Sequence, residues 1–146
     1  MFEMRPRFDA KNFKSFAKNL KSSVSNLEPA FDEFGRYIQP ETQRQFTTET
    51  DPDGNKWAEL SPVTLLRKQT PYILRETFFM YSMIFYVATK NSFEFGIRDP
   101  KYKFHHEGTA KMPARVVIGI TDKRKQRLNR IIIVYLKRVR SRRARV

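Results

Sequence analysis

The chain contains no cysteine among its 146 residues, and this absence excludes disulfide bonds and thiolate-ligated metal sites. Glycine is scarce, with five residues, and no glycine-rich loop that could hold a nucleotide phosphate is present. The longest mostly apolar run, residues 78–88, is too short to cross a bilayer as a helix, which needs roughly 20 apolar residues. The first residues also lack the apolar run of a signal peptide. We therefore expect a soluble protein made in a cytoplasm, with no membrane partner.

Histidine is almost absent, since only the adjacent His105 and His106 occur. Neighbouring residues do not share a helix face, so this pair cannot supply the two ligands of a zinc-protease helix. No GxSxG nucleophile elbow is present. A calcium loop starting at Asp51 would need Gly and Glu where the chain has Lys56 and Pro62. The sequence thus predicts no catalytic, metal-binding or cofactor-binding residues, and we interpret the chain as a non-enzyme.

Acidic residues are missing from the last part of the chain, which is strongly basic. The net charge is +14, and eleven Lys or Arg residues lie between Lys123 and Arg145 without one acid. Such an excess raises affinity for nucleic acid, anionic surfaces or acidic proteins and does not choose among them. Three interpretations stay open: a helix laid along phosphates, a face docked on acidic neighbours in an assembly, and a solvated helix face. The candidate contact residues are Arg138, Arg140, Arg142, Arg143 and Arg145.

Hydrophobic periodicity predicts several helices. Apolar residues recur every three or four positions over residues 9–27 and, less regularly, over residues 28–46. A Ser-Pro pair is suited to start a short helix, which we expect over residues 62–68. A last helix is expected over residues 121–139, because a Thr-Asp start precedes an apolar stripe at helical spacing. A buried strand over residues 131–136 is the alternative.

Alternation of apolar side chains predicts a small sheet. Residues 83–88 and 93–97 both alternate and are joined by a short polar turn, which is typical of a β-hairpin. One helical turn is expected over residues 102–107, ended by Gly108. Arg115–Ile120 is predicted to form a third strand.

Together these elements predict a single α+β domain over residues 1–140. Its antiparallel sheet of about three strands, including the hairpin, packs against N-terminal and C-terminal helices. The last six residues, 141–146, continue no periodic pattern and are expected to form a mobile basic tail. Asp53-Gly54 is a turn dipeptide, and Trp57, the only tryptophan, is expected to hold the following loop against the core.

Two blocks of residues, together and in this order, resemble a family signature. The first block is Pro52-Asp53-Gly54, Trp57, Leu60-Ser61 and Thr64, followed by Ile73-Leu74 and Thr77. The second is Tyr102, His105 or His106, Gly108 and Pro113-Ala114-Arg115. The pattern resembles the phage virion morphogenesis family, also called the tail completion family, over roughly residues 30–140. Departures from it are Phe78-Phe79 after Thr77, Lys103 after Tyr102, and the Arg-rich end.

This resemblance implies a structural protein of a tailed-phage neck or tail end, assembled in the host cytoplasm and present in the virion. Such proteins form homo-oligomeric rings, often sixfold, that close the tail or join it to the head. The implied partners are further copies of the chain and other neck or tail proteins. Transient contact of the Arg-rich end with DNA in the lumen is left open. The family has no catalytic residues to transfer, so neither enzyme activity nor a cofactor is implied.

Edge strands and protruding loops often provide the contacts of a ring that closes head to tail. We therefore expect the hairpin region, residues 81–97, and the loop 108–113 to contribute contacts. The alternative function is a stand-alone basic nucleic-acid-binding protein, whose binding would weaken steeply with salt. An apolar, strand-paired ring would persist better. The structural or interface candidates are Trp57, Asp53, Gly54, His106, Gly108, Pro113 and Arg115.

Overall fold

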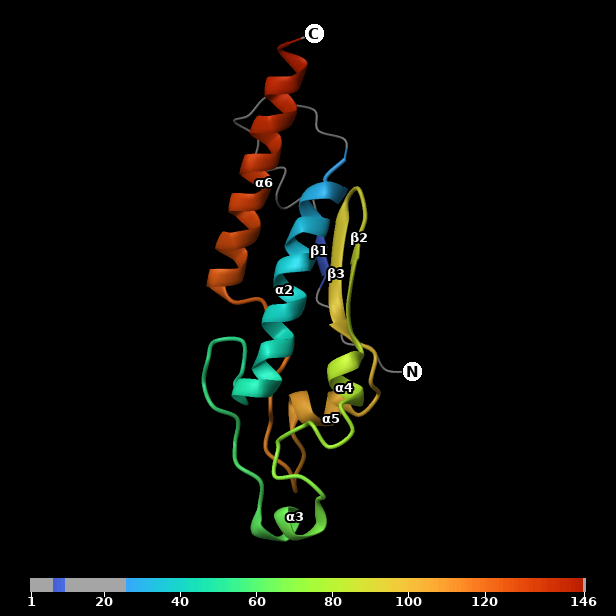
Figure 1. The fold of residues 1–146 in the computed structure, drawn as a ribbon, viewed down its shortest axis with the longest axis vertical. Helices are drawn as coiled ribbons and strands as arrows, with labels where there is room; N and C mark the ends of the chain where they lie inside the picture. Colours follow the sequence, from blue (N-terminus) through green and yellow to red (C-terminus); the bar gives the residue numbers. More distant parts are fainter. Residues whose placement is uncertain (1–6, 10–25, 146) are drawn as a thin grey trace.

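The computed structural model describes residues 7–9 and 26–145, so the helix predicted over residues 9–27 lies almost entirely outside the described part. The elements in chain order are β1 (Arg7–Asp9), α2 (Glu28–Thr48), α3 (Pro62–Arg67), α4 (Phe79–Ser82), β2 (Ile84–Ala88), β3 (Ser92–Ile97), α5 (Tyr102–Glu107) and α6 (Asp122–Arg143). Figure 1 shows an elongated molecule with α3 at one end and the last turns of α6 at the other. The predicted α+β class is confirmed.

Strands β2 and β3 form the predicted hairpin and, with β1, an antiparallel sheet in the order β1-β3-β2. Ile84 pairs with Ile97 at one end of the hairpin, and Ala88 pairs with Phe93 at the other. The residues of β3 that alternate toward α2 are fully enclosed, as Phe93 and Phe95 illustrate. The strand order makes β3 the middle strand of the sheet and β2 an outer strand, in agreement with this burial.

The prediction of a strand over Arg115–Ile120 is wrong, and the third strand is β1 instead. The segment is not part of the sheet because side chains bond its backbone. The Tyr102 hydroxyl accepts hydrogen bonds from the N–H groups of Val117 and Ile118. The amide of Gln45 donates to the Val117 carbonyl. These bonds satisfy the backbone without a neighbouring strand.

Helix α2 confirms the helix predicted over residues 28–46 and lies between the sheet and α6 (Figure 1). Gly35 fits its buried face because a Cβ there would lie 2.3 Å from ring atoms of Tyr86, closer than real side chains approach. The helix continues through Pro40, which is exposed. Its buried apolar residues are Ala30, Phe31, Phe34, Ile38 and Phe46.

Helix α6 begins, as predicted, after Thr121, whose side-chain oxygen accepts a hydrogen bond from the N–H of Arg124. Its apolar stripe is buried against α2, and residues 131–136 are helical, so the alternative strand is excluded. The helix continues to Arg143, so the first three residues of the predicted tail are helical, and the mobility of the tail stays a prediction. No helix in the described part is long and apolar enough to cross a membrane.

Candidate functional site

The loop after α2 contains two of the predicted candidates, Asp53 and Gly54. One carboxylate oxygen of Asp51 accepts hydrogen bonds from the backbone N–H groups of Asp53 and Asn55, both at 2.9 Å. Gly54 has a φ of +91°, which favours glycine, and the predicted turn is confirmed. The Asp51 carboxylate therefore stabilises its own loop by accepting these backbone hydrogen bonds. Within the described residues, no three His, Asp or Glu side chains gather where they could hold a metal ion.

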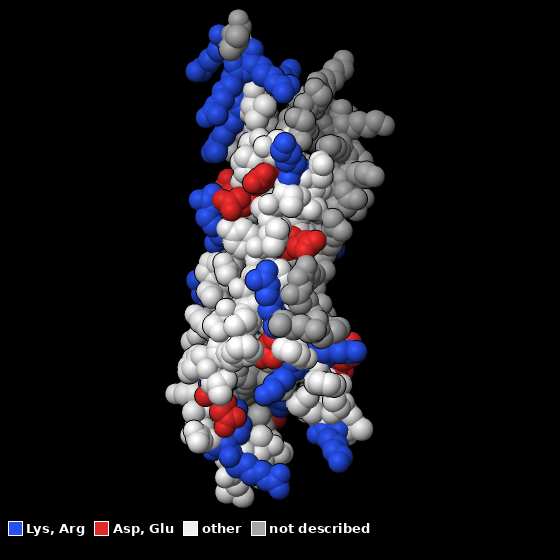
Figure 2. Space-filling model, turned by 90° about the vertical axis from the view of Figure 1, so that its right-hand side faces the viewer, with Lys and Arg blue, Asp and Glu red and all other residues white. Residues whose placement is uncertain are grey.

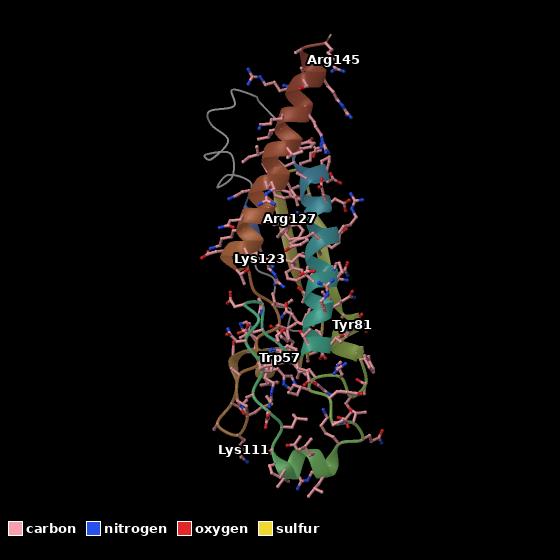
Figure 3. The ribbon with its side chains drawn as sticks, turned by 60° about the vertical axis from the view of Figure 1, so that its left-hand side comes forward. Trp57, Tyr81, Lys111, Lys123, Arg127 and Arg145 are labelled. Carbon is pink, nitrogen blue, oxygen red and sulfur yellow. The ribbon has the colours of Figure 1, made fainter. Side chains whose placement is uncertain are left out.

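Trp57 holds this loop against the core, as predicted. Its ring is buried and lies edge-on to Phe46, with 5.7 Å between the ring centroids. The indole Nε1 donates a hydrogen bond of 2.9 Å to the carbonyl of Val116. Trp57 thus joins the loop after α2 to the extended segment 115–120 in the interior of the molecule (Figure 3).

Arg115 is another predicted candidate, and the structure buries it. Its Nε donates to the Ala58 carbonyl at 2.8 Å, and its Nη2 donates to the Glu59 carbonyl at 2.9 Å. Burial lowers the pKa of the guanidinium. The side chain therefore fastens the segment that leads from Trp57 to α3.

His106 belongs to a hydrogen-bonded junction at Tyr102. The Tyr102 hydroxyl accepts the N–H of Val117 at 3.0 Å and the N–H of Ile118 at 2.7 Å. Because both acceptor positions are used, we assign the hydroxyl hydrogen to His106 Nδ1, 2.9 Å away. Burial raises the pKa of Tyr102 to about 12 and lowers the pKa of His106, so the hydroxyl and the imidazole are both neutral near pH 7.

Gly108 ends α5, as predicted, and opens the loop that contains Pro113. Its φ is +72°, and a Cβ there would lie 2.8 Å from the backbone nitrogen of Ala114. Pro113 is exposed, as is Lys111 beside it. Figure 3 shows Lys111 at the same end of the molecule as α3. The loop expected to contribute contacts therefore lies beside α3.

Helix α3 presents three exposed large apolar side chains, including the most exposed one of the described residues, and we call it the apolar arm. The exposed fraction is 88% for Leu66, 56% for Val63 and 46% for Leu65. No residue of the helix is buried. The helix forms as predicted, because the Ser61 side chain accepts a hydrogen bond from the N–H of Thr64. Its formation therefore depends on local capping, and its apolar side chains do not reach the core.

An open groove of about 600 Å³ lies beside the apolar arm. Residues before and within α3, the segment before α4 and the loop after α5 line it together. Apolar lining residues are Leu60, Leu74, Phe79, Met112 and Pro113. Arg115 also lines it, so the structure brings two of the predicted candidates, Pro113 and Arg115, to one groove. His105 lines it as well, whereas the candidate His106 does not.

The opposite end of the molecule is basic, and we call residues 137–145 of α6 and its extension the basic end. Figure 2 shows Lys and Arg side chains gathered there. A shallow groove of about 360 Å³ lies along this end, between Val134 and Arg145. The predicted contact residues Arg138, Arg140, Arg142, Arg143 and Arg145 are all exposed.

Sequence reasoning did not select Val63, Leu65 and Leu66. Apolar side chains that face several directions on a six-residue helix need cover from several neighbours, and the sequence does not show whether the chain supplies it. Val63 and Leu66 are three residues apart and share a face, whereas Leu65 lies about 100° round the helix from Leu66. A short helix with this pattern needs cover from more than one side, and its own chain does not supply it.

Comparison with known proteins gives one match. A sequence profile of the phage virion morphogenesis family matches residues 8–137. Neither the curated proteins nor the solved structures gave a match. The matched range includes the turn at Gly54, the junction at Tyr102 and most of α6, and it stops before Arg138.

Proposed function

The chain belongs to the phage virion morphogenesis family, and from this premise we propose that it is the subunit of a ring at the neck or tail end of a tailed phage. The family supports a structural role in virion assembly. The ring would complete the tail or join it to the head. Its mechanism would be ordered binding, without a catalysed reaction.

The observation that carries the proposal is the apolar arm. Leu66 is 88% exposed at the tip of the molecule, and Val63 and Leu65 beside it are exposed as well. Neighbouring exposed apolar side chains of this kind are characteristic of a contact surface. Burying each of Val63, Leu65 and Leu66 in a neighbour would contribute about 1.5–3 kcal/mol at full burial. Association would therefore give these side chains the cover that the chain itself does not supply.

A patch at one end of an elongated molecule suits a head-to-tail contact. The arm of one copy would meet a different surface of the next copy, and such a contact forms a closed ring when the rotation between copies fits. The groove beside the arm lies in the same region, so both can take part in one extended contact. This arrangement also involves the loop 108–113.

The hairpin offers a second contact, at the outer edge of β2. The hydrogen bond from Arg98 N–H to the Met83 carbonyl shows that odd-numbered residues of β2 direct their backbone groups to β3. Tyr86 and Ala88 therefore direct theirs to the outer edge, where no described strand pairs with them. An exposed edge of this kind is suited to pairing with a strand of a neighbour.

The test is the mass of the purified protein in solution, measured by native mass spectrometry or light scattering at low and high salt. We expect a discrete oligomer that persists in high salt, because screening weakens charge pairs and leaves apolar contacts. Leu65→Glu with Leu66→Glu should give a monomer. Phe104→Glu is the matched control, since Phe104 is 56% exposed and lines neither groove.

Complementation of a phage that lacks this gene tests the same proposal inside the virion. The arm variant should fail to produce complete particles, and the Phe104 variant should produce them. Complete particles at wild-type titre with the arm variant would show that the arm is not the contact surface. A wild-type chain that is absent from purified virions would contradict the proposed function itself.

A further inference from the structure

The basic end concentrates positive charge beyond the packed part of the molecule. Lys137, Arg138, Arg140, Arg142, Arg143 and Arg145 are all exposed. Figure 1 shows this part of α6 projecting past α2 and the hairpin. Six cations within nine residues repel one another, and the helix holds them together. A partner with regularly spaced negative charge would relieve this repulsion.

Two exposed arginines elsewhere in the chain have acidic neighbours, and the basic end differs from them. Arg36 lies 3.0 Å from Asp32, and Arg44 lies 2.8 Å from Glu41. Among the described residues, no ion pair reaches residues 137–145. The charge of the basic end is therefore available to an external partner.

The composition of the basic end distinguishes phosphates from a protein partner. Protein interfaces bind through a buried apolar or aromatic centre, surrounded by polar groups. The segment 137–145 contains no aromatic residue, and its largest apolar side chain is Val139. Binding to a nucleic-acid backbone needs positive charge and no such centre. Single strands are disfavoured because no aromatic side chain is present for bases to stack on.

We propose that the basic end binds the phosphate backbone of double-stranded DNA without reading its sequence. Arg138, Arg142 and Arg145 are spaced at helical intervals and line one groove together with Lys137 and Ser141. Residues 137–143 are helical and extend about 10 Å, a length over which duplex DNA carries about six charges. Guanidinium groups bond phosphate oxygens in pairs, which suits them to this contact.

This inference goes beyond the proposed ring and does not depend on it, because it rests on residues 137–145 alone. These residues lie at the opposite end of the molecule from the apolar arm (Figure 1). All but the first also lie outside the range that the family profile matches. A chain that forms a ring and ignores DNA would contradict the inference only, whereas a monomer that binds DNA would contradict the ring only.

The experiment measures binding of the full chain to a fluorescent DNA duplex of random sequence by anisotropy, across a series of salt concentrations. If all six cations engage phosphates, affinity should fall about 10³-fold between 50 and 200 mM salt, with a log–log slope of about −5. Replacing Arg138, Arg142 and Arg145 by Gln should reduce the slope by about 3. Glutamine keeps the helix propensity close to that of arginine.

The matched control replaces Arg36, Arg44 and Lys56 by Gln, which removes the same charge from another part of the surface. It should keep the wild-type slope, within about 1 unit. If the salt slope decreased equally in both variants, DNA affinity would depend on net charge alone and the proposal would be overturned. Wild-type DNA binding by the basic-end variant, combined with failed particle assembly, would assign the basic end to a protein partner. If the chain bound duplex RNA with the same affinity as duplex DNA, the contact with a phosphate backbone would stand and the assignment to DNA would be wrong.

Discussion

Around Tyr102, buried polar groups find partners within the chain, whereas α3 leaves its apolar side chains exposed. The Tyr102 hydroxyl, the Arg115 guanidinium and the Trp57 indole each bond backbone groups of distant segments. The apolar arm makes only local bonds, such as the cap at Ser61. Substitutions near Tyr102 should therefore change stability, and substitutions in the arm should change association.

The largest loss of stability is expected for Tyr102→Phe. The change leaves the buried N–H groups of Val117 and Ile118 without their acceptor. Each unsatisfied group costs about 1–3 kcal/mol, so the free energy of unfolding should fall by about 2–6 kcal/mol in urea titration. Tyr135→Phe is the control, because its hydroxyl makes one bond, to the Asn26 carbonyl, and should cost about 1 kcal/mol. Equal losses in the free energy of unfolding for the two variants would contradict a special role for Tyr102.

Gly35→Ala should destabilise the chain by about 1–3 kcal/mol, although alanine normally stabilises a helix interior. The added Cβ would meet the ring of Tyr86, whose hydroxyl donates a 2.9 Å hydrogen bond to Asp32. Thermal unfolding measures the effect. Tyr86→Ala in the Gly35→Ala background should remove most of the extra cost, as a double-mutant cycle would show. A stabilising Gly35→Ala would contradict the close approach of α2 to β2.

Stability should decrease as the pH falls below about 6.5, the unfolded pKa of histidine. Burial lowers the pKa of both His106 and His105 in the folded chain, so the unfolded state binds more protons in this range. The full contribution is present above pH 6.5 and is lost as the pH falls toward the lowered pKa values. Unfolding midpoints from about pH 8 to about pH 5 measure the loss.

His106→Gln separates the contribution of His106 to the pH dependence of stability from that of His105. The variant should show a smaller decrease in midpoint than the wild type over the same pH range, because one titrating group is removed. It should also be less stable at high pH, since its amide does not reproduce the hydrogen bond between Tyr102 and the imidazole. An unchanged pH dependence would assign the effect to His105 or to another group.

The smallest effect on stability is expected in the apolar arm. Leu66→Lys should change the free energy of unfolding of the monomer by less than about 0.5 kcal/mol, because the side chain is 88% exposed. Unfolding must be measured on a chain that is monomeric, such as the Leu65→Glu background. A cost above about 2 kcal/mol would mean that the arm packs on its own chain and would remove the contrast with Tyr102.

Local signals in the sequence were sufficient to predict several helices and strands. The Ser-Pro start of α3, the Thr-Asp start of α6 and the glycine that ends α5 act within a few residues, so the expected elements formed. The alternation of apolar side chains was sufficient to predict the hairpin. The short helix α4 was not predicted, because it follows Phe78, which has a φ of +56° that the local sequence does not indicate.

Among the candidates for contact, Trp57 and Arg115 lie inside the molecule, while Pro113 and the arginines of the basic end are exposed. The positions of the family motifs could be read from the sequence, but whether a motif residue packs inward could not. Arg115 illustrates the reason, since its acceptors are carbonyls of Ala58 and Glu59, more than fifty residues earlier. Their contact roles stay predictions.

The sequence alone determined the α+β class, the turn at Gly54, the family and the concentration of cations after Lys123, because each depends on residue type and short spacing. Tertiary structure decided that the segment 115–120 bonds to the Tyr102 hydroxyl and does not join the sheet. It also decided that α3 stands apart from the core. Both outcomes depend on contacts between distant parts of the chain, and local preferences contain no information about those distances.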